Sequence, residues 1–210
     1  MHPVLVDLIE RYPDLESALD SIQAAYDLLS ATYHGGGKLL ICGNGGSASD
    51  SDHIVGELMK AFERKRPIPD DLRQRLQNQN PQIGAYLADH LQGALPAISL
   101  SGHAALMTAI SNDVAGDMVF AQQVLGYGVK GDTLIGISTS GNSTNVLHAI
   151  HVAKALDLHT IGLTGRSGGA MRDICDVTIC VPYDRTAAVQ ERHLPIYHAL
   201  SVMLEQEFFA

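Results

Sequence analysis

Residues 38–47 read Lys-Leu-Leu-Ile-Cys-Gly-Asn-Gly-Gly-Ser, an apolar run that is followed at once by a loop of small residues. Residues 133–143 repeat this arrangement, with the loop Ser138-Thr139-Ser140-Gly141-Asn142-Ser143 after a second apolar run. A helical pattern follows each loop. The free N–H groups at a helix N-terminus attract anions, small residues allow close approach, and hydroxyls add donors. The two segments therefore predict strand–loop–helix units that bind a phosphorylated small molecule.

Short apolar runs and helical patterns alternate along the chain after two opening helices, predicted at Pro3–Glu10 and Pro13–Tyr33. Most runs lack the alternation of a half-exposed sheet, which indicates a buried parallel sheet. The order predicts an α/β fold, a doubly wound αβα sandwich of three layers with five parallel strands, whose ligands lie beyond the carboxyl ends of the strands. The predicted strands are Lys38–Cys42, Ala97–Leu100, Thr133–Ser138, Thr160–Thr164 and Val177–Val181, and the later helices are Ala48–Phe62, Ala104–Asn112, Ala121–Leu125, Asn142–Leu156 and Thr186–Phe208.

Length and composition fit a single domain over residues 1–210, with N-terminal helices in residues 1–34, because 46% hydrophobic residues can form a substantial core. The 14 Lys and Arg against 23 Asp and Glu give a formal charge of −9, which disfavours nucleic acid and anionic membranes as partners. No apolar run approaches the roughly 20 residues of a spanning helix. Asp7 and Glu10 stand where a secretory signal needs positive charge. We expect a cytoplasmic protein whose cysteines (Cys42, Cys175 and Cys180) are buried, reduced thiols.

Residues 63–95 interrupt the alternation, because they are rich in charge, Gln, Asn and Pro and separate the first two strands. Asp70-Asp71 can cap a helix over Leu72–Leu76, and Ile83–Leu91 shows a second helical pattern. We therefore expect a helical insertion near the mouth of the site. Its basic residues favour a solvated face, with contact to a ligand left open as an alternative; they are Arg64, Lys65, Arg66, Arg73 and Arg75.

Other phosphate-binding motifs fit the first loop less well. The nucleotide-binding pattern GxxxxGK[ST] is missing from the sequence, which argues against nucleoside triphosphate hydrolysis. Residues 43–48 match the dinucleotide pattern GxGxxA, but the acidic residue expected about 20 positions later falls on Glu63, in or just after a helix rather than at a strand end. A nicotinamide enzyme is therefore disfavoured, and a purely structural glycine turn stays open.

Acid–base side chains occur at helical spacing on two predicted helices. His53 and Glu57 are four residues apart and share a face one turn beyond the first loop. Glu57 has largely apolar neighbours, so its carboxylate needs either an exposed edge or a partner. Gln190 and His198 also share a face of the last helix, although the sequence alone does not establish that the two faces meet. A structural role is the alternative for His53 and His198, and it is the favoured interpretation for His193.

These residues resemble the sugar isomerase (SIS) domains, and among them the phosphoheptose isomerases. The resemblance covers nearly the whole chain. It rests on the two opening helices, the Cys-Gly-Asn-Gly-Gly-Ser loop, the helix with His53 and Glu57, Ser111-Asn112-Asp113, residues 136–143, Leu163-Thr164-Gly165, and a last helix with Gln190, His193 and His198.

The resemblance implies an aldose–ketose isomerase that converts sedoheptulose 7-phosphate to D-glycero-D-manno-heptose 7-phosphate through an enediol. It implies that Glu57 and His198 transfer protons and that one zinc ion is bound by His53, Glu57, Gln190 and His198. It also implies a homotetramer with shared active sites. The residues implied to line the phosphosugar pocket are Asn44, Gly45, Gly46, Ser47, Glu57, Asn112, Asp113, Ser138, Thr139, Ser140, Ser143 and Gln190.

Three features depart from the family pattern. Ala61, with Lys60 beside it, replaces the usual Arg four residues after Glu57, Ala187 replaces the usual Asp three residues before Gln190, and residues 63–95 are inserted. Lost polar partners and an added flap are what another phosphosugar would require. A second hypothesis is a non-catalytic SIS tetramer that binds the replication initiator DnaA or senses a phosphosugar, but that replication-associated relative lacks the counterparts of Glu57 and His198.

Overall fold

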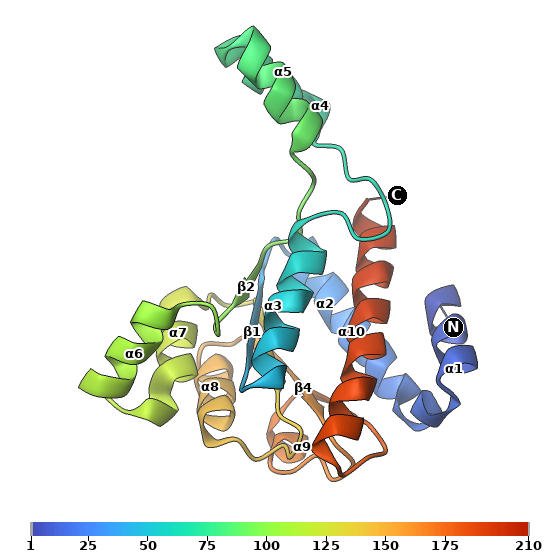
Figure 1. The fold of residues 1–210 in the computed structure, drawn as a ribbon, viewed down its shortest axis with the longest axis vertical. Helices are drawn as coiled ribbons and strands as arrows, with labels where there is room; N and C mark the ends of the chain where they lie inside the picture. Colours follow the sequence, from blue (N-terminus) through green and yellow to red (C-terminus); the bar gives the residue numbers. More distant parts are fainter. Residues whose placement is uncertain (1, 210) are drawn as a thin grey trace.

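Five parallel strands form the sheet that the apolar runs predict (Figure 1). The computed structural model describes residues 2–209, so that Met1 and Ala210, the ends of the predicted domain, lie outside the described residues. The strand order β2-β1-β3-β4-β5 is that of a doubly wound sheet, which confirms the predicted fold class. The strands are β1 (Leu39–Gly43), β2 (Ala97–Ser99), β3 (Thr133–Ile137), β4 (His159–Thr164) and β5 (Val177–Cys180).

Helices cover both faces of the sheet and enclose two hydrophobic cores. Successive strand side chains point to opposite faces. Leu39 and Ile41 therefore pack with α1, α2, α3 and α10, whereas Leu40 and Cys42 pack with α6, α7 and α8. The helices are α1 (Pro3–Arg11), α2 (Leu19–His34), α3 (Gly46–Met59), α4 (Asp70–Gln79), α5 (Pro81–His90), α6 (Ala104–Asp113), α7 (Val119–Tyr127), α8 (Thr144–Ala155), α9 (Met171–Ile174) and α10 (Thr186–Phe208), with 3-10 helices η1 (Pro13–Ala18) and η2 (Gly116–Met118).

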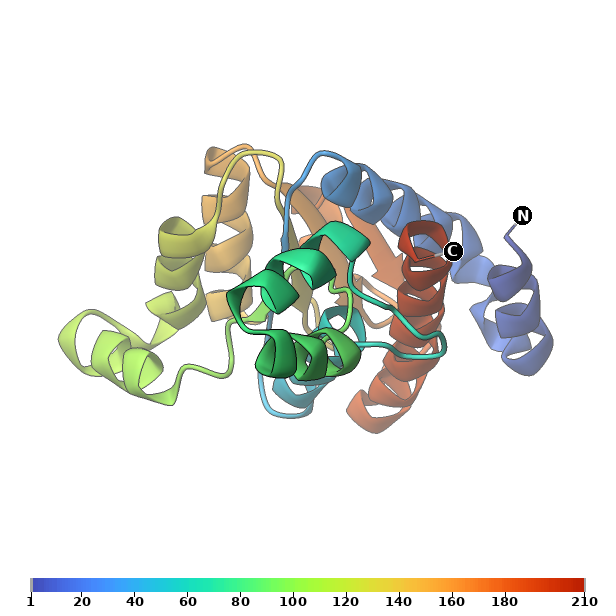
Figure 2. The ribbon, with the colours of Figure 1, turned by 90° about the horizontal axis from the view of Figure 1, so that it is seen from above.

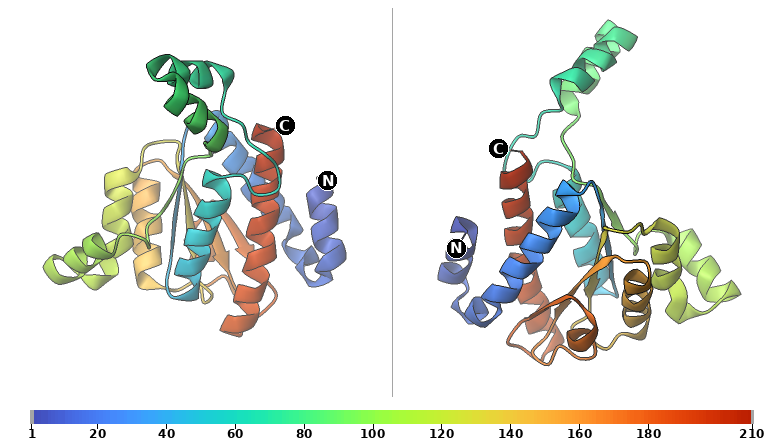
Figure 3. Two further views of the ribbon diagram at one scale, coloured as in Figure 1. Left: turned by 45° about the horizontal axis from the view of Figure 1, so that its top comes forward. Right: turned by 180° about the vertical axis from the view of Figure 1, so that it is seen from behind.

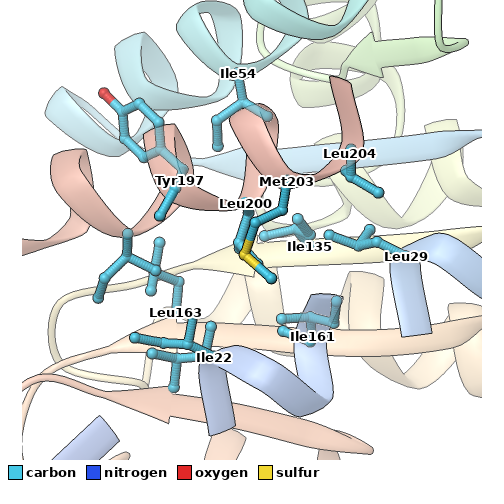
Figure 4. Packing of buried hydrophobic residues seen from close by; sticks show 14 of the residues in the cluster. Ile22, Leu29, Ile54, Ile135, Ile161, Leu163, Tyr197, Leu200, Met203 and Leu204 are labelled. Carbon is cyan, nitrogen blue, oxygen red and sulfur yellow. The ribbon is translucent and has the colours of Figure 1, made fainter. Parts of the chain in front are cut away.

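The first core fixes α10 against the sheet. In Figure 4, Leu200, Met203 and Leu204 of α10 lie over Ile135 and Ile161 of the sheet, and all five side chains are buried. Ile54 of α3 joins the same cluster, so α3 and α10 lie side by side on one face. Within residues 2–209, no helix combines the length and the apolar character that crossing a bilayer demands.

Several helix ends differ from the predictions by one or two residues, and some differ more. The predicted helix Pro13–Tyr33 is divided into η1 and α2. Helix α3 begins at Gly46 and ends at Met59, three residues before the predicted end at Phe62. The backbone of Lys60 is extended, and the N–H groups of Phe62 and Glu63 bond the side chain of Glu205 on α10, so the chain leaves the helix early.

The inserted segment forms a hairpin of α4 and α5, which pack on each other (Figure 3). Figure 1 shows this hairpin beyond the end of α10, at the opposite end of the molecule from α9, and Figure 2 looks down onto it, so its helices are not at the loop edge where an insertion at the site mouth was expected. Both ends of the segment reach the interior, with Arg66 buried near its start and Leu95 in the hydrophobic core at its end. Arg66, expected on a solvated face, is 1% exposed and pairs with Glu205, whereas Arg64, Lys65 and Arg75 are exposed and Arg73 is partly exposed.

Candidate active site

The first glycine loop lies at the N-terminus of α3. Gly45 caps the helix with a φ of 56°, a conformation that favours glycine. A Cβ on Gly46 would lie 2.5 Å from Nε2 of Gln190, so glycine allows α10 to approach the loop. The Ser47 N–H bonds the carbonyl of Asn44 at 3.0 Å, while the Asn44 side chain is exposed. The loop thus leaves small residues at the start of a helix open to an anion.

The second loop is a cluster of hydroxyls at the N-terminus of α8. The Oγ atoms of Ser138 and Ser143 lie 2.8 Å apart, and Oγ of Ser140 lies 3.5 Å from Ser138. Ser138 is buried, Thr139 and Ser143 are half-buried, and Ser140 is exposed. The carbonyl of Thr139 accepts a bond from the Gly165 N–H at 3.1 Å, which ties the loop to the end of β4. The hydroxyls are therefore held together before any ligand binds.

Strand register brings the two loops side by side. Gly43 at the end of β1 pairs with Ile137 at the end of β3, so both loops leave the same edge of the sheet. The side-chain amides of Asn44 and Asn145 exchange two hydrogen bonds of 2.9 Å across the gap. The predicted loop residues therefore meet at the carboxyl edge, as expected for a ligand site of this fold.

A second group of polar residues lies further along α3 and α10. His53 Nε2 lies 3.0 Å from Oε1 of Glu57, and Lys60 Nζ donates to Oε2 of Glu57 at 3.2 Å. The ring of His198 lies 5.1 Å from that of His53, so the faces of the two helices meet. The sequence spacing predicted each face, and the structure brings them together within one subunit.

His198 has unused bonding capacity. Within the described residues, its Nε2 is buried without a hydrogen-bond partner. Burial and the neighbouring His53 lower the pKa of His198 below its ordinary value, against the opposing charge of Glu57. The imidazole is therefore neutral at pH 7 and can accept a proton or bind a cation.

Two residues that were not predicted from the sequence, Tyr197 and Asp50, form a hydrogen-bond chain to His53. The Tyr197 hydroxyl lies 3.1 Å from Nδ1 of His53 and donates to Oδ1 of Asp50 at 3.2 Å. Burial raises the pKa of Asp50. Their positions in the sequence could have indicated them, because Asp50 lies about one helical turn before His53 and Tyr197 is next to His198.

The four predicted zinc ligands do not form one cluster. Gln190 adjoins Gly46 at the first loop, and the eight residues from Gln190 to His198 span about 12 Å of helix axis. Within residues 2–209, no group of three or more His, Cys, Asp or Glu side chains is arranged to hold a metal ion. The His53–Glu57 hydrogen bond joins two of the donors directly.

Asn112 and Asp113 lie apart from both groups. They end α6, are exposed, and bond each other at 2.7 Å. Figures 1 and 2 show α6 at the outer edge of the molecule, on the other side from α10. The subunit alone does not bring these two predicted pocket residues to the loops.

His193 is buried on α10 between Gln190 and His198. Its Nε2 lies 3.4 Å from the carbonyl of Thr164, while its Nδ1 has no partner in the described chain, so it is only half satisfied. Burial lowers the pKa of His193 to about 4. A cavity of about 360 Å³ lies between α1 and α10, and His198, Arg11 and Phe62 are among the residues that line it.

Comparison with known proteins identifies the family. The SIS domain model matches residues 7–93 and 87–165. The chain belongs to the SIS-domain family. This SIS domain is 38% identical over 206 residues to a phosphoheptose isomerase of Synechocystis sp., covering 96% of this chain and 93% of that one. It is 40% identical over 194 residues to a phosphoheptose isomerase of Helicobacter pylori, covering 92% and 88%.

Solved structures of the SIS family have the same fold. A phosphoheptose isomerase from Neisseria gonorrhoeae superposes with a TM-score of 0.75 at 33% identity, over 96% of this chain and 94% of that chain. One from Francisella tularensis gives a TM-score of 0.73 at 33% identity, over 89% and 86%. The resemblance stated from the sequence motifs is confirmed.

Proposed function

We propose that this SIS protein isomerises sedoheptulose 7-phosphate to D-glycero-D-manno-heptose 7-phosphate. The observation that carries the proposal is the meeting of Glu57 and His53 on α3 with His198 on α10, two helices that also meet at the first glycine loop. The similarity to proteins named phosphoheptose isomerase supports a sugar-phosphate isomerase.

The phosphate group binds at the two loops in this proposal. The N-termini of α3 and α8 offer free N–H groups, and the clustered hydroxyls of Ser138, Ser140 and Ser143 offer further donors. Thr139, Asn44 and Ser47 complete the proposed pocket. Because the phosphate does not react, its binding energy can orient the carbons that do.

Proton transfer occurs at the other group of residues. Glu57 removes a proton from the carbon beside the carbonyl, which gives a cis-enediol, and returns it one carbon along. His198 moves the second proton between the two oxygens, a role that suits an imidazole kept neutral by burial. No atom is gained or lost, since the aldose and the ketose are isomers.

Zinc is the proposed cofactor, held by His53, Glu57 and His198, whereas Gln190 lies apart from them at the first loop of the same subunit. The donor chemistry fits, because imidazole nitrogen and carboxylate oxygen are ordinary zinc ligands and Nε2 of His198 is buried without a partner in the described chain. When bound, zinc would polarise the carbonyl and stabilise the enediolate. To bind the ion, Glu57 and His53 would give up the hydrogen bond that now joins them.

We also propose a cytoplasmic homotetramer with shared sites, in which Asn112 and Asp113 of α6 serve the pocket of a neighbouring subunit. Their exposure on an outer helix supports this role. Sedimentation at micromolar concentration is expected to give a tetramer, and a monomer would contradict the shared site.

The reaction is tested in D2O with zinc-loaded protein and sedoheptulose 7-phosphate. We expect an aldose heptose 7-phosphate that carries deuterium on the carbon next to the new carbonyl, because the enediol proton exchanges with solvent. Mass spectrometry of the product detects both changes. A failure to form any aldose would refute the proposed reaction for this sugar.

The departures at Ala61 and Ala187 make a substrate panel a necessary control. Phosphorylated ketoses of five, six and seven carbons are compared by kcat/KM under the same conditions. We expect the seven-carbon sugar to have the highest value. A higher kcat/KM for a shorter sugar would support the proposed isomerisation but identify that shorter sugar phosphate as the substrate.

A further inference from the structure

Arg66 is a buried cation at the base of the inserted segment. Its Nε donates to Oε1 of Glu205 at 2.7 Å, and both side chains are inaccessible to solvent. We infer that Arg66, held by Glu205, is a positioning residue that fixes Glu57 relative to His198. The inference rests on the proposed function, because it concerns the same acid–base pair.

The guanidinium of Arg66 caps the C-terminus of α3. The last four carbonyls of a helix have no partner inside the helix. Arg66 donates to the carbonyl of Leu58 at 2.7 Å and to the carbonyl of Glu57 at 2.9 Å. A cation at this end is also favoured by the helix dipole. The backbone that carries the proposed base is therefore bonded directly to Arg66.

Glu205 holds the guanidinium from the side of α10. Its carboxylate also accepts bonds from the backbone N–H groups of Phe62, Glu63 and Arg64 at 2.9, 2.8 and 3.1 Å. The ring of Phe209 lies 4.7 Å from the guanidinium carbon. Charged hydrogen bonds on one side and an aromatic ring on another leave Arg66 a single orientation.

Together these bonds connect the two helices that carry the acid–base groups. Glu205 follows His198 by seven residues, so the two side chains lie on the same face of α10. Arg66 joins Glu205 to the carbonyl of Glu57. A displacement of α3 against α10 would have to break these buried bonds, and small errors in the placement of reacting groups reduce turnover strongly.

An exposed pair in the same inserted segment provides a matched control. Arg73 donates to Asp89 at 2.8 Å, with side chains 35% and 62% exposed. This pair joins α4 to α5 and does not contact α3. It has the same chemistry as Arg66 and Glu205 without the connection to Glu57.

The test uses the full chain with Arg66→Met combined with Glu205→Gln. The double variant leaves no buried charge unpaired, and the new amide oxygen can still accept the bonds of the Glu63 and Arg64 N–H groups, which share one oxygen of Glu205, so the fold is expected to survive. We expect kcat to fall at least tenfold while KM for the sugar phosphate stays within about threefold. Arg66→Lys, which keeps the charge opposite Glu205, is the second variant, with an intermediate loss of kcat. Arg73→Met with Asp89→Asn is expected to leave both constants unchanged.

Hydrogen exchange separates the positioning role from the proposed reaction. In the double variant we expect faster exchange of the amides of residues 56–60, with residues 47–52 unchanged. A folded double variant with unchanged kcat and unchanged exchange at residues 56–60 would overturn the positioning role. If the wild type does not turn over sugar phosphates, the proposed function fails, and the exchange rates still decide whether Arg66 fixes the end of α3.

Discussion

The two ends of the candidate site differ in how their polar groups are satisfied. At the proposed phosphate end, Ser138 bonds Ser143, and Asn44 bonds Asn145, so the loops hold themselves in place. At the proposed reacting end, Nε2 of His198 has no partner in the described chain. The first end is preorganised for an anion, and the second keeps a donor atom free for a proton or a metal ion.

The comparison separates binding from turnover. Changes at the loops should weaken binding of substrate and transition state alike, whereas changes at the reacting end should lower kcat.

Glu57→Gln should have the largest effect. The amide cannot accept the proton from carbon, so we expect kcat to fall about 10³-fold while KM changes by less than about threefold. Steady-state kinetics measures both constants. Glu191→Gln, which changes an exposed carboxylate on α10, is the matched control and should match the wild type. A Glu57→Gln protein with near-normal kcat would remove Glu57 as the base.

His193→Gln should change the pH dependence of folding, because His193, which lies between the two ends, is buried. Its pKa in the folded protein, about 4, is below the 6.5 of the unfolded chain. Its contribution to stability is therefore fully present above pH 6.5 and is lost as the pH falls from 6.5 to 4, by about 3 kcal/mol.

Urea denaturation at pH 7 and at pH 4 measures this contribution. The free energy of unfolding of the wild type should fall by about 3 kcal/mol more than that of His193→Gln. Equal losses in the two proteins would show that His193 is not buried in its neutral form.

Ser138→Ala should affect binding at the phosphate end. One hydrogen bond to a charged group is lost, so we expect KM to rise about tenfold with little change in kcat. Ser21→Ala removes a hydroxyl of α2 that bonds only the carbonyl of Ala18, and it serves as the control. A fall in kcat without a rise in KM would contradict the division between the two ends.

Lys60→Gln should have the smallest effect, although Lys60 bonds Glu57. Its side chain is 59% exposed, and exposed ion pairs contribute at most about 1 kcal/mol. We expect kcat to change by less than about threefold. A larger loss would show that Lys60 takes over the role of the Arg that Ala61 replaces.

Local sequence patterns predicted most of the fold and part of the site. The apolar runs predicted all five strands, and the spacing of His53 and Glu57 predicted their shared face. The contact between His53 and His198 joins distant segments, so only the family resemblance predicted it. The predicted end of α3 was wrong. Arg66 bonds the last carbonyls of α3, and Arg66 is itself held by Glu205, which lies far away in the sequence on α10.

Arg66 shows the limit most clearly. A run of basic residues predicts a solvated face, since the sequence does not indicate which member finds a buried partner. The available signal was Glu205, an acidic residue that directly follows the largely apolar stretch Leu200–Leu204 of α10. A charge in a buried stretch requires a partner of opposite sign.

The two ends of the inserted segment are fastened to each other. Pro67 and Gln92 form an isolated bridge, the Gly93 N–H bonds the carbonyl of Arg66 at 2.7 Å, and the Leu95 N–H bonds the carbonyl of Leu58 at 3.0 Å. Closing a longer loop between fixed ends adds only about 0.6 kcal/mol of entropy for each doubling of its length. The stretch between Pro67 and Gln92 can therefore change in length and sequence with little effect on the stability of the sheet. This junction is a place where related proteins can differ in surface while they keep the same fold.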